Sequence, residues 1–412
     1  MGRCIGGIVP CFALAASLVA PAAASQPHIL LVSIDTLRAM NLSSYGYHRN
    51  TSPNIDRLLA GGARFDNART VEPLTAPALA SMLTSLHPHE HGSTRNGLRV
   101  RPSLYSFTKS LGRRGYETAA FVGNWTLKSE LSGLDEHFET YEAVLTRKRW
   151  FGLAKSEATA DDLIDLSLSW LDTHLAASDK PFLMWVHMIE PHAPYRLRGE
   201  FLEQIGVRRA GSVFSPRKRY DSEIAFADDR TGRLLEAVYE RVPREDVLVV
   251  FFSDHGESLG EHGYWGHGRH LYEFSLYIPL GFSWPGRIEP RVVSEPALIL
   301  DLPATILGLL GLEVPEFLGG YDWPGTLLRG EPGPSGRETL YQAHRSSVEP
   351  QEDQRRLRAR GLLELARLQN GRKELYRVGS GKHRVFDLAT DATELNDLST
   401  AGAEPSPELS AW

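Results

Sequence analysis

The sequence predicts an α/β fold in which a mixed, mostly parallel sheet is sandwiched between helices and followed by a small C-terminal antiparallel sheet. The first observation behind this prediction is that short, apolar, β-branched runs alternate with longer segments of helical periodicity, as in parallel sheets. The second is a change after residue 330 to short segments joined by Asn-Gly and Gly-Ser-Gly turns. The third is an ordinary globular composition, with 42% hydrophobic and 23% charged residues in a chain of 412.

Apolar and periodic segments define the individual elements. Buried strands are predicted over residues 28–34, 118–122, 182–188 and 247–252. Helices are predicted over residues 53–59, 77–86, 106–111, 160–175 and 222–241. The first of these helices begins at Ser52-Pro53, because proline fits a first turn, and it ends at Gly61-Gly62.

The C-terminal part is predicted to form a separate small sheet. Gly330-Glu331-Pro332-Gly333-Pro334 has the composition of a linker, so we assign residues 26–330 to the main domain. Residues 335–400 are predicted to form an antiparallel meander, since Asn370-Gly371 is a strong hairpin signal. Residues 401–412 are rich in Pro, Ser and Glu and are expected to fray.

The first 25 residues are expected to be a signal peptide rather than part of the fold. Arg3 precedes an apolar stretch, and Ala22-Ala23-Ala24-Ser25 offers a small-residue cleavage site. An uncleaved membrane anchor is the alternative, but Pro10 and Pro21 interrupt the apolar run. We therefore expect an exported protein, periplasmic or extracellular, with no stable membrane span after cleavage.

Charge and cysteine content exclude several classes of protein. Lys and Arg total 45 against 51 Asp and Glu, a net charge of −6, so no nucleic-acid partner is expected. The only two cysteines, Cys4 and Cys11, lie in the signal-like segment. The mature chain is therefore expected to have neither a disulfide framework nor a cysteine-ligated zinc site. The sequence leaves the oligomeric state open.

Acidic residues follow two of the predicted strands, at the ends where sites form in open α/β sheets. Asp35 follows the first strand, and Asp254-His255 follow the strand over residues 247–252. Two carboxylates and an imidazole are suitable ligands for a divalent ion. The alternative is that each aspartate caps the next helix.

Thr75 lies at the start of the helix predicted over residues 77–86, because Pro77 suits a first turn. Free N–H groups and the helix dipole favour an anion at this point. Near a metal the hydroxyl could be a nucleophile, since a divalent ion lowers the pKa of a hydroxyl bound to it. A simple N-cap is the alternative.

Six segments in this order resemble the sulfatase-like branch of the alkaline phosphatase superfamily, over most of the mature chain. They are residues 32–38 (VSIDTLR), 51–58 (TSPNIDRL), 83–92 (LTSLHPHEHG), 190–195 (EPHAPY), 253–257 (SDHGE) and 386–391 (FDLATD). The resemblance implies the fold already predicted and a metal-dependent ester hydrolase.

The chain departs from the family's sulfatases at the nucleophile. Those enzymes oxidise a Cys or Ser of C-x-P-S-R to formylglycine, whereas this chain has Thr75-Ala76-Pro77-Ala78-Leu79, so no formylglycine is expected. Gly123-Asn124-Trp125-Thr126 stands where the family has G-K-W-H. Thr36 replaces the second Asp of a pair, and His267 stands where Lys is common. At these positions the chain is similar to the members of the superfamily that act on phospho groups, such as lipoteichoic acid synthases and phosphoethanolamine transferases.

The resemblance implies a role for each candidate residue. The implied metal ligands are Asp35, Thr75, Asp254 and His255; the catalytic residues are Thr75, His192 and His267; the candidate substrate contacts are Asn124, His187 and Arg269. The cofactor is one divalent ion, with Zn or Mn favoured by these oxygen and nitrogen ligands and Ca as the alternative. A surface salt bridge is the simpler interpretation of Arg269.

Together these features predict an exported metal-dependent hydrolase that cleaves a phosphodiester, a phosphonate monoester or a sulfate ester through Thr75. Because few cationic side chains remain, monoanionic esters are favoured over phosphate monoesters. The ester would belong to a small molecule, a glycan or a lipid. The alternatives are an inactive binding protein with this fold and a phosphoryl-group transferase.

Other charged and histidine residues are expected to have no part in the chemistry. These are His87, His89 and His91 after the Thr75 helix, Asp221, Glu223 and Asp228 on a solvated helix face, and the basic run of residues 355–360 on an exposed face.

Overall fold

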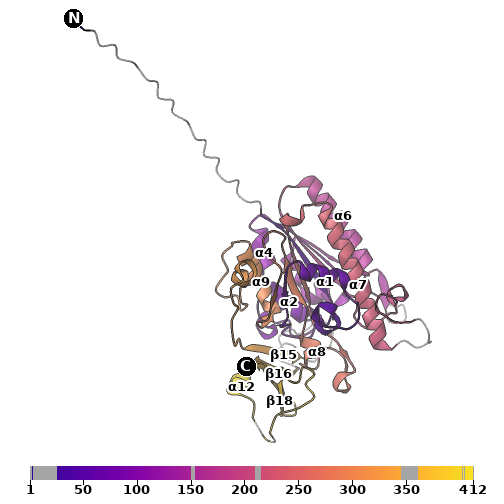
Figure 1. Ribbon diagram of the computed structural model, residues 1–412, viewed down its shortest axis with the longest axis vertical. Coiled ribbons are helices and arrows are strands. Elements are labelled where there is room, and N and C mark those ends of the chain that lie inside the picture. Colours follow the sequence, from indigo (N-terminus) through magenta and orange to yellow (C-terminus); the bar gives the residue numbers. More distant parts are fainter. Residues whose placement is uncertain are drawn as a thin grey trace.

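The computed structural model describes Gly2 and residues 26–149, 154–208, 215–344, 361–400, 402 and 404–411. Its core is an eight-stranded sheet with strand order β13-β2-β12-β9-β1-β8-β4-β5 (Figure 1). In that order the strands are Arg291–Val293, Ala63–Phe65, Leu280–Ser283, Val247–Ser253, His28–Ile34, Phe182–Met188, Glu117–Val122 and Thr140–Ala143.

The centre of the sheet is parallel, as predicted. β1 pairs in parallel with β8 on one side and β9 on the other, and β4 pairs in parallel with β8. β12 runs antiparallel to β9, which makes the sheet mixed. The four predicted strands are thus confirmed as β1, β4, β8 and β9, and nearly every residue in them is buried.

Helices cover both faces of the sheet (Figure 1). On one face lie α1 (Pro53–Ala60), α6 (Ala160–Ala177) and α7 (Pro216–Tyr239), and on the other lie α2 (Thr75–Thr84), α4 (Phe107–Gly112) and α9 (Leu302–Leu309). Side chains of β1 pack against the helices on both faces. Leu30 and Val32 face the first group of helices, and Ile29 and Leu31 face the second. This alternation is the period-2 geometry of a strand covered on both sides.

Smaller elements complete the main domain. They are β3 (Ala68–Arg69), β6 (Arg147–Arg149), β7 (Ala154–Glu157), β10 (Ser258–Leu259), β11 (Trp265–Gly266), β14 (Ala297–Leu298), α3 (Pro88–His91), α5 (Ser129–Ser132), α8 (Glu273–Leu276) and α10 (Pro324–Arg329).

The acidic residues of α7 correct one expectation. Asp221, Glu223 and Asp228 are buried, with 1%, 2% and 1% of their surface exposed, rather than on a solvated face. Asp228 accepts hydrogen bonds from the backbone N–H groups of Asn54 and Ile55, so it caps the start of α1. Burial raises the pKa of Asp228 to about 7 and that of Glu223 to about 8. Polar residues on a helix reveal solvent exposure only when no other element covers that face.

The small C-terminal sheet has the order β15-β16-β17-β18, with strands Thr339–His344, Leu362–Gln369, Arg372–Arg377 and Lys382–Asp387. Its strands are antiparallel, and Asn370-Gly371 forms the predicted hairpin turn, with φ of 50° and 78°. The tail does not simply fray. Residues 407–411 form α12 (Pro407–Ala411), and its Leu409 is 1% exposed.

Two predictions fall largely on segments beyond the described residues. These are the signal peptide, apart from Gly2, and the basic run of residues 355–360. Within the described ranges, no helix combines the length and the apolar character that crossing a bilayer requires.

Candidate active site

Four neighbouring strands bring polar side chains to one edge of the sheet. Asp254 follows β9, Asp35 follows β1, His187 lies one residue before the end of β8, and Asn124 follows β4. The sheet order places these strands side by side. All four side chains are buried, with at most 2% of their surface exposed. Parallel strands therefore assemble the site from segments far apart in the chain.

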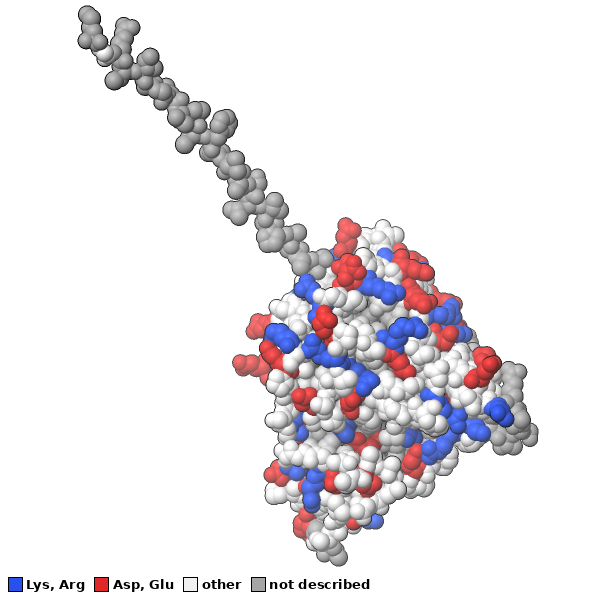
Figure 2. Space-filling model, in the orientation of Figure 1, with Lys and Arg blue, Asp and Glu red and all other residues white. Residues whose placement is uncertain are grey.

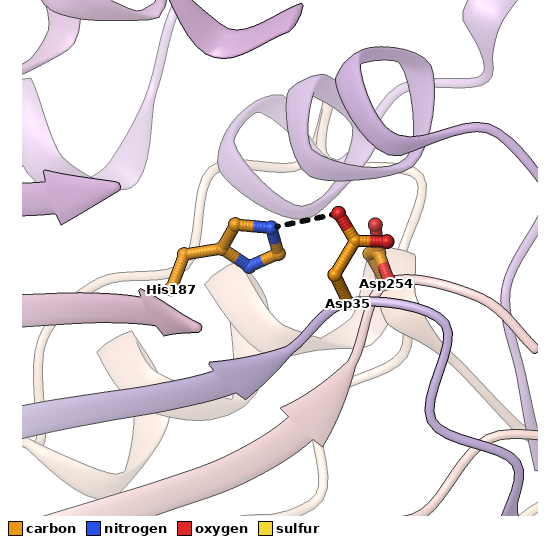
Figure 3. A group of neighbouring side chains, drawn as sticks. All are labelled: Asp35, His187 and Asp254. Atoms are coloured by element: carbon orange, nitrogen blue, oxygen red, sulfur yellow. Dashed lines mark ion pairs between the residues drawn. The ribbon is translucent and has the colours of Figure 1, made fainter. Parts of the chain in front are cut away.

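Asp35, His187 and Asp254 form a compact cluster (Figure 3). One ligand atom from each lies within 4.8 Å of the others, and His187 Nε2 is 3.6 Å from Asp35 Oδ2. Among the described residues, Asp35 Oδ1, Asp254 Oδ2 and His187 Nε2 have no hydrogen-bond partner. Buried polar atoms without partners are costly, and a divalent ion would satisfy all three. The residues present therefore fit a metal.

The two carboxylates have opposite pKa shifts. Burial opposes ionisation of Asp35, but the imidazoles of His192 and His187 outweigh it and hold the pKa of Asp35 well below its ordinary value. Burial, together with the negative charge of Asp35, raises the pKa of Asp254 well above its usual range. Asp35 and Asp254 together can therefore hold one proton between them, or a metal cation in place of that proton.

Backbone and amide donors fix both carboxylates. The N–H groups of Thr36 and His255 donate to Asp254 Oδ1 at 3.1 Å and 2.8 Å. Thr36 adopts a left-handed φ of 58°, and its own hydroxyl has no partner among the described residues. Asn124 Nδ2 donates to Asp35 Oδ2 at 2.6 Å. Asn124, predicted as a substrate contact, thus holds a carboxylate of the cluster in this structure.

Thr75 is the first residue of α2 and is 1% exposed. The N-cap residue of α2 is Leu74, and the Thr75 hydroxyl lies 3.4 Å from His255 Nε2. Because His255 Nδ1 donates to the carbonyl of Gly256 at 2.8 Å, Nε2 of the neutral ring carries a lone pair. Burial, followed by the nearby His267, lowers the pKa of His255 to about 3, so the ring is neutral. This lone pair, also 3.4 Å from Asp254 Oδ2, can accept a proton or bind a metal.

His267 and His192 lie beside the His255 ring. The His267 ring centroid is 4.5 Å from that of His255 and 5.2 Å from that of His192. His267 Nδ1 is 2.9 Å from Glu257 Oε1. Burial alone would lower the pKa of His267, but the Glu257 carboxylate raises it above its ordinary value. These two imidazoles are therefore placed to meet a group bound at Thr75.

Other predicted residues have different surroundings. Arg269 is exposed, and its described contact is a backbone carbonyl that accepts from Arg377. Of the three demoted histidines, His91 is buried against Ser81 and His89 contacts Gln342.

The sequence analysis missed two residues near the site. Asn96 Oδ1 accepts a hydrogen bond from the Ala76 N–H at the start of α2. Glu257 is fully buried behind His267. Glu257 is part of the SDHGE segment, so its position two residues after His255 was a signal that could have been used.

Known proteins resemble this chain in sequence. A profile described as Sulfatase matches residues 27–312. An uncharacterised sulfatase of Escherichia coli is 26% identical and aligns over 72% of this chain and 70% of that protein. The choline-sulfatase of Rhizobium meliloti is 25% identical, over 71% of this chain and 69% of that protein.

Solved structures share the fold. The phosphonate monoester hydrolase of Agrobacterium radiobacter has a TM-score of 0.71 at 19% identity, covering 91% of this chain and 92% of that chain. A protein solved with its substrate D-glucosamine-2-N,6-O-disulfate has a TM-score of 0.72 at 20% identity, covering 91% and 93%. Because the family profile spans well over half of the sequence, the chain belongs to the sulfatase family.

Proposed function

We propose that this protein is an exported, metal-dependent hydrolase that cleaves sulfate esters, phosphodiesters or phosphonate monoesters, with Thr75 as the nucleophile. One observation carries the proposal. The Thr75 hydroxyl is buried at the first helical position of α2, after the N-cap residue Leu74, and lies 3.4 Å from the lone pair of His255. A threonine that caps a helix occupies the N-cap position itself, so capping does not account for this hydroxyl.

One divalent ion would be held by Asp35, Asp254, His255 and Thr75. Its contribution when bound is to lower the pKa of the nucleophilic hydroxyl and to offset the charge of the carboxylates. The unpartnered oxygens of Asp35 and Asp254 support this assignment. Zinc or manganese suits a set of carboxylate, hydroxyl and imidazole ligands without thiols.

The chain's own residues would divide the reaction into two displacements. Thr75 Oγ1 loses its proton to solvent and bonds to sulfur or phosphorus, while the bond to the leaving oxygen breaks. The leaving oxygen takes a proton from His267 or His192, which lie together next to His255. Water then gives a proton to the imidazole that acted as the acid and attacks the sulfur or phosphorus. The bond to Thr75 breaks, and the threonine oxygen takes a proton from solvent.

The charge of the site supports esters that carry one negative charge. Two buried carboxylates face the metal position, and they repel a dianion more strongly than a monoanion. Positive charge would come from the ion and from His267, which is held beside Glu257. Sulfate esters, phosphodiesters and phosphonate monoesters are monoanions at neutral pH, and relatives named for sulfatase and phosphonate monoester activity support this class.

The test compares hydrolysis of four nitrophenyl esters: sulfate, phosphate monoester, phosphate diester and phosphonate monoester. Mature protein supplied with zinc or manganese is measured beside Thr75→Ala and Thr84→Ala. Thr84, at the other end of α2, is equally buried and bonds to the Ala80 carbonyl, so it controls for packing. We expect activity on a monoanionic ester that disappears only in Thr75→Ala.

Other results would redirect the assignment. Equal rates for Thr75→Ala and the unchanged protein would remove Thr75 as nucleophile. No hydrolysis of any ester would favour a binding protein with this fold. Delivery of the group to added glycerol in preference to water would indicate a transferase.

A further inference from the structure

We infer that His187 is itself a ligand of the divalent ion, so that the site offers two imidazoles and two carboxylates. The inference rests on the proposed metal dependence and extends it to a residue on a third strand. It also assigns the metal class, because calcium prefers oxygen ligands, whereas zinc and related transition metals bind imidazole.

The position of His187 in the sheet is the first argument. β8 lies next to β1, and His187 is in register with Ser33, two residues before Asp35. The side chain is fully buried and points along the edge of the sheet toward Asp35, with Asp254 beyond (Figure 3). The ring nitrogen Nε2 has no hydrogen-bond partner among the described residues, and the oxygen nearest to it, Asp35 Oδ2, accepts a hydrogen bond from Asn124. A fully buried ring nitrogen aimed at two carboxylates is poorly explained by packing alone.

The spacing between His187 and Asp35 is the second argument. Their closest nitrogen and oxygen atoms are 3.6 Å apart. This separation is too long for a hydrogen bond. Two ligands at zinc distances of about 2.0–2.2 Å and a tetrahedral angle lie about 3.3–3.6 Å from each other. The observed separation is thus that of two ligands on one ion.

The contacts behind His187 are the third argument. Ser33 Oγ lies 2.8 Å from His187 Nδ1 and accepts a hydrogen bond from Trp185 Nε1, also at 2.8 Å. A hydroxyl oxygen has two lone pairs, so Ser33 can accept from Nδ1–H as well as from Trp185. In that tautomer the Nε2 lone pair faces the carboxylates. A polar group that holds the far nitrogen is the usual support of a metal-bound histidine.

The residue at position 36 adds a reason for an extra ligand. Thr36 follows Asp35 directly, and its hydroxyl has no described partner. It brings no second carboxylate to the site. The imidazole of His187, on β8, would supply a ligand from the strand on the other side of β1 from β9. A neutral imidazole adds no negative charge that would repel an anionic ester.

The test counts imidazoles on the bound metal. Zinc is loaded into the purified mature protein, and zinc-edge X-ray absorption measures how many imidazole rings coordinate it. Isothermal titration gives the zinc Kd of the same samples. The variants are His187→Asn and His255→Asn. The control is His174→Asn, a buried histidine on α6 that contacts Glu117 and the Lys180 carbonyl.

We expect two imidazoles per zinc in the unchanged protein and in His174→Asn, and one in His187→Asn, with the Kd raised at least about 100-fold. One imidazole in the unchanged protein, an unaltered count in His187→Asn, or no zinc binding would overturn the inference. The last two results would leave His187 as a neighbour that only orients Asp35, or as no part of a metal site. A count of one imidazole in the unchanged protein overturns the inference even if a variant fails to fold, and the loss of one imidazole in His187→Asn assigns the second one to His187.

The outcome is separable from the proposed hydrolysis. Zinc bound through two imidazoles in a protein that cleaves no ester would retain this inference and overturn the function. If ester hydrolysis is lost in Thr75→Ala but His187 does not bind the metal, the proposed function is retained and this inference is overturned.

Discussion

Nδ1 of His267 lies 2.9 Å from Oε1 of Glu257, and the His267 ring centroid lies 4.5 Å from that of His255. Glu257 is fully buried, whereas the His267 side chain keeps 16% of its surface exposed. The buried carboxylate therefore fixes Nδ1 of the ring. We predict that Glu257→Gln lowers kcat by about 10- to 100-fold for esters with poor leaving groups. The reason is that the Glu257 carboxylate no longer raises the pKa of His267, so less of the imidazole is protonated.

The leaving group makes the Glu257 prediction specific. Nitrophenolate departs without protonation, so nitrophenyl esters should lose much less activity than alkyl esters of the same acid. Glu261→Gln is the control, since Glu261 pairs instead with Arg38 and Arg217. Equal losses of activity for both kinds of ester would show that Glu257 does not assist proton donation by His267.

We predict that Asn96 positions the Thr75 hydroxyl by fixing the first turn of α2. Its side-chain oxygen accepts from the Ala76 N–H, one of the free donors at the start of α2. Asn96→Ala should destabilise the protein by about 1 kcal/mol and also lower kcat. Ser106→Ala, which removes the cap of α4, should cost similar stability in urea unfolding but leave kcat unchanged. A normal kcat in Asn96→Ala would contradict the positioning role.

Metal removal should abolish turnover reversibly. Dialysis against a chelator is expected to eliminate ester hydrolysis, because the buried carboxylates then lack their cation. Zinc or manganese should restore it, whereas calcium should not if imidazoles complete the site. Full activity in metal-free protein, verified by elemental analysis, would refute the metal requirement.

A buried charge network attaches the C-terminal sheet to the main domain. Lys373 on β17 is fully buried and lies 2.8 Å from both Glu273 of α8 and Glu394. Lys373→Met should destabilise the protein by about 3–5 kcal/mol, because it leaves the buried Glu394 without its cation, whereas Glu273 keeps its ion pair with Arg69. Chemical unfolding measures the loss, with Lys382→Met, an exposed lysine of the same sheet, as the neutral control. Similar stability of the two variants would exclude a structural role for the network.

Acid should destabilise the fold through buried histidine. Burial, followed by the charge of Lys109, lowers the pKa of His137 to about 3 from 6.5. Between these values the unfolded chain binds the proton and the folded chain does not. The contribution is therefore present above pH 6.5 and is lost at about 1.4 kcal/mol per pH unit as the pH falls toward 3. His137→Gln should flatten the dependence of unfolding free energy on pH over this range by that amount.

Local pattern accounts for most of the elements found. The four buried strands, the Asn370-Gly371 hairpin and the helix beginning at Thr75 follow from apolar runs, turn residues and Pro77. These signals act over a few residues, so a sequence contains them directly. The expectation for Asp221, Glu223 and Asp228 was wrong because their burial depends on contacts with segments such as residues 41–55, which no local pattern encodes.

The sequence by itself therefore determined which side chains leave the strand ends, namely Asp35, Asn124 and Asp254, and that a threonine begins α2. The tertiary structure decided which of them meet. β8 lies between β1 and β4, and this order brings His187 within 3.6 Å of Asp35, while Asn124 donates to the same carboxylate. The order of strands depends on long-range packing of two helical layers, because every central strand is equally apolar and could locally pair with any other.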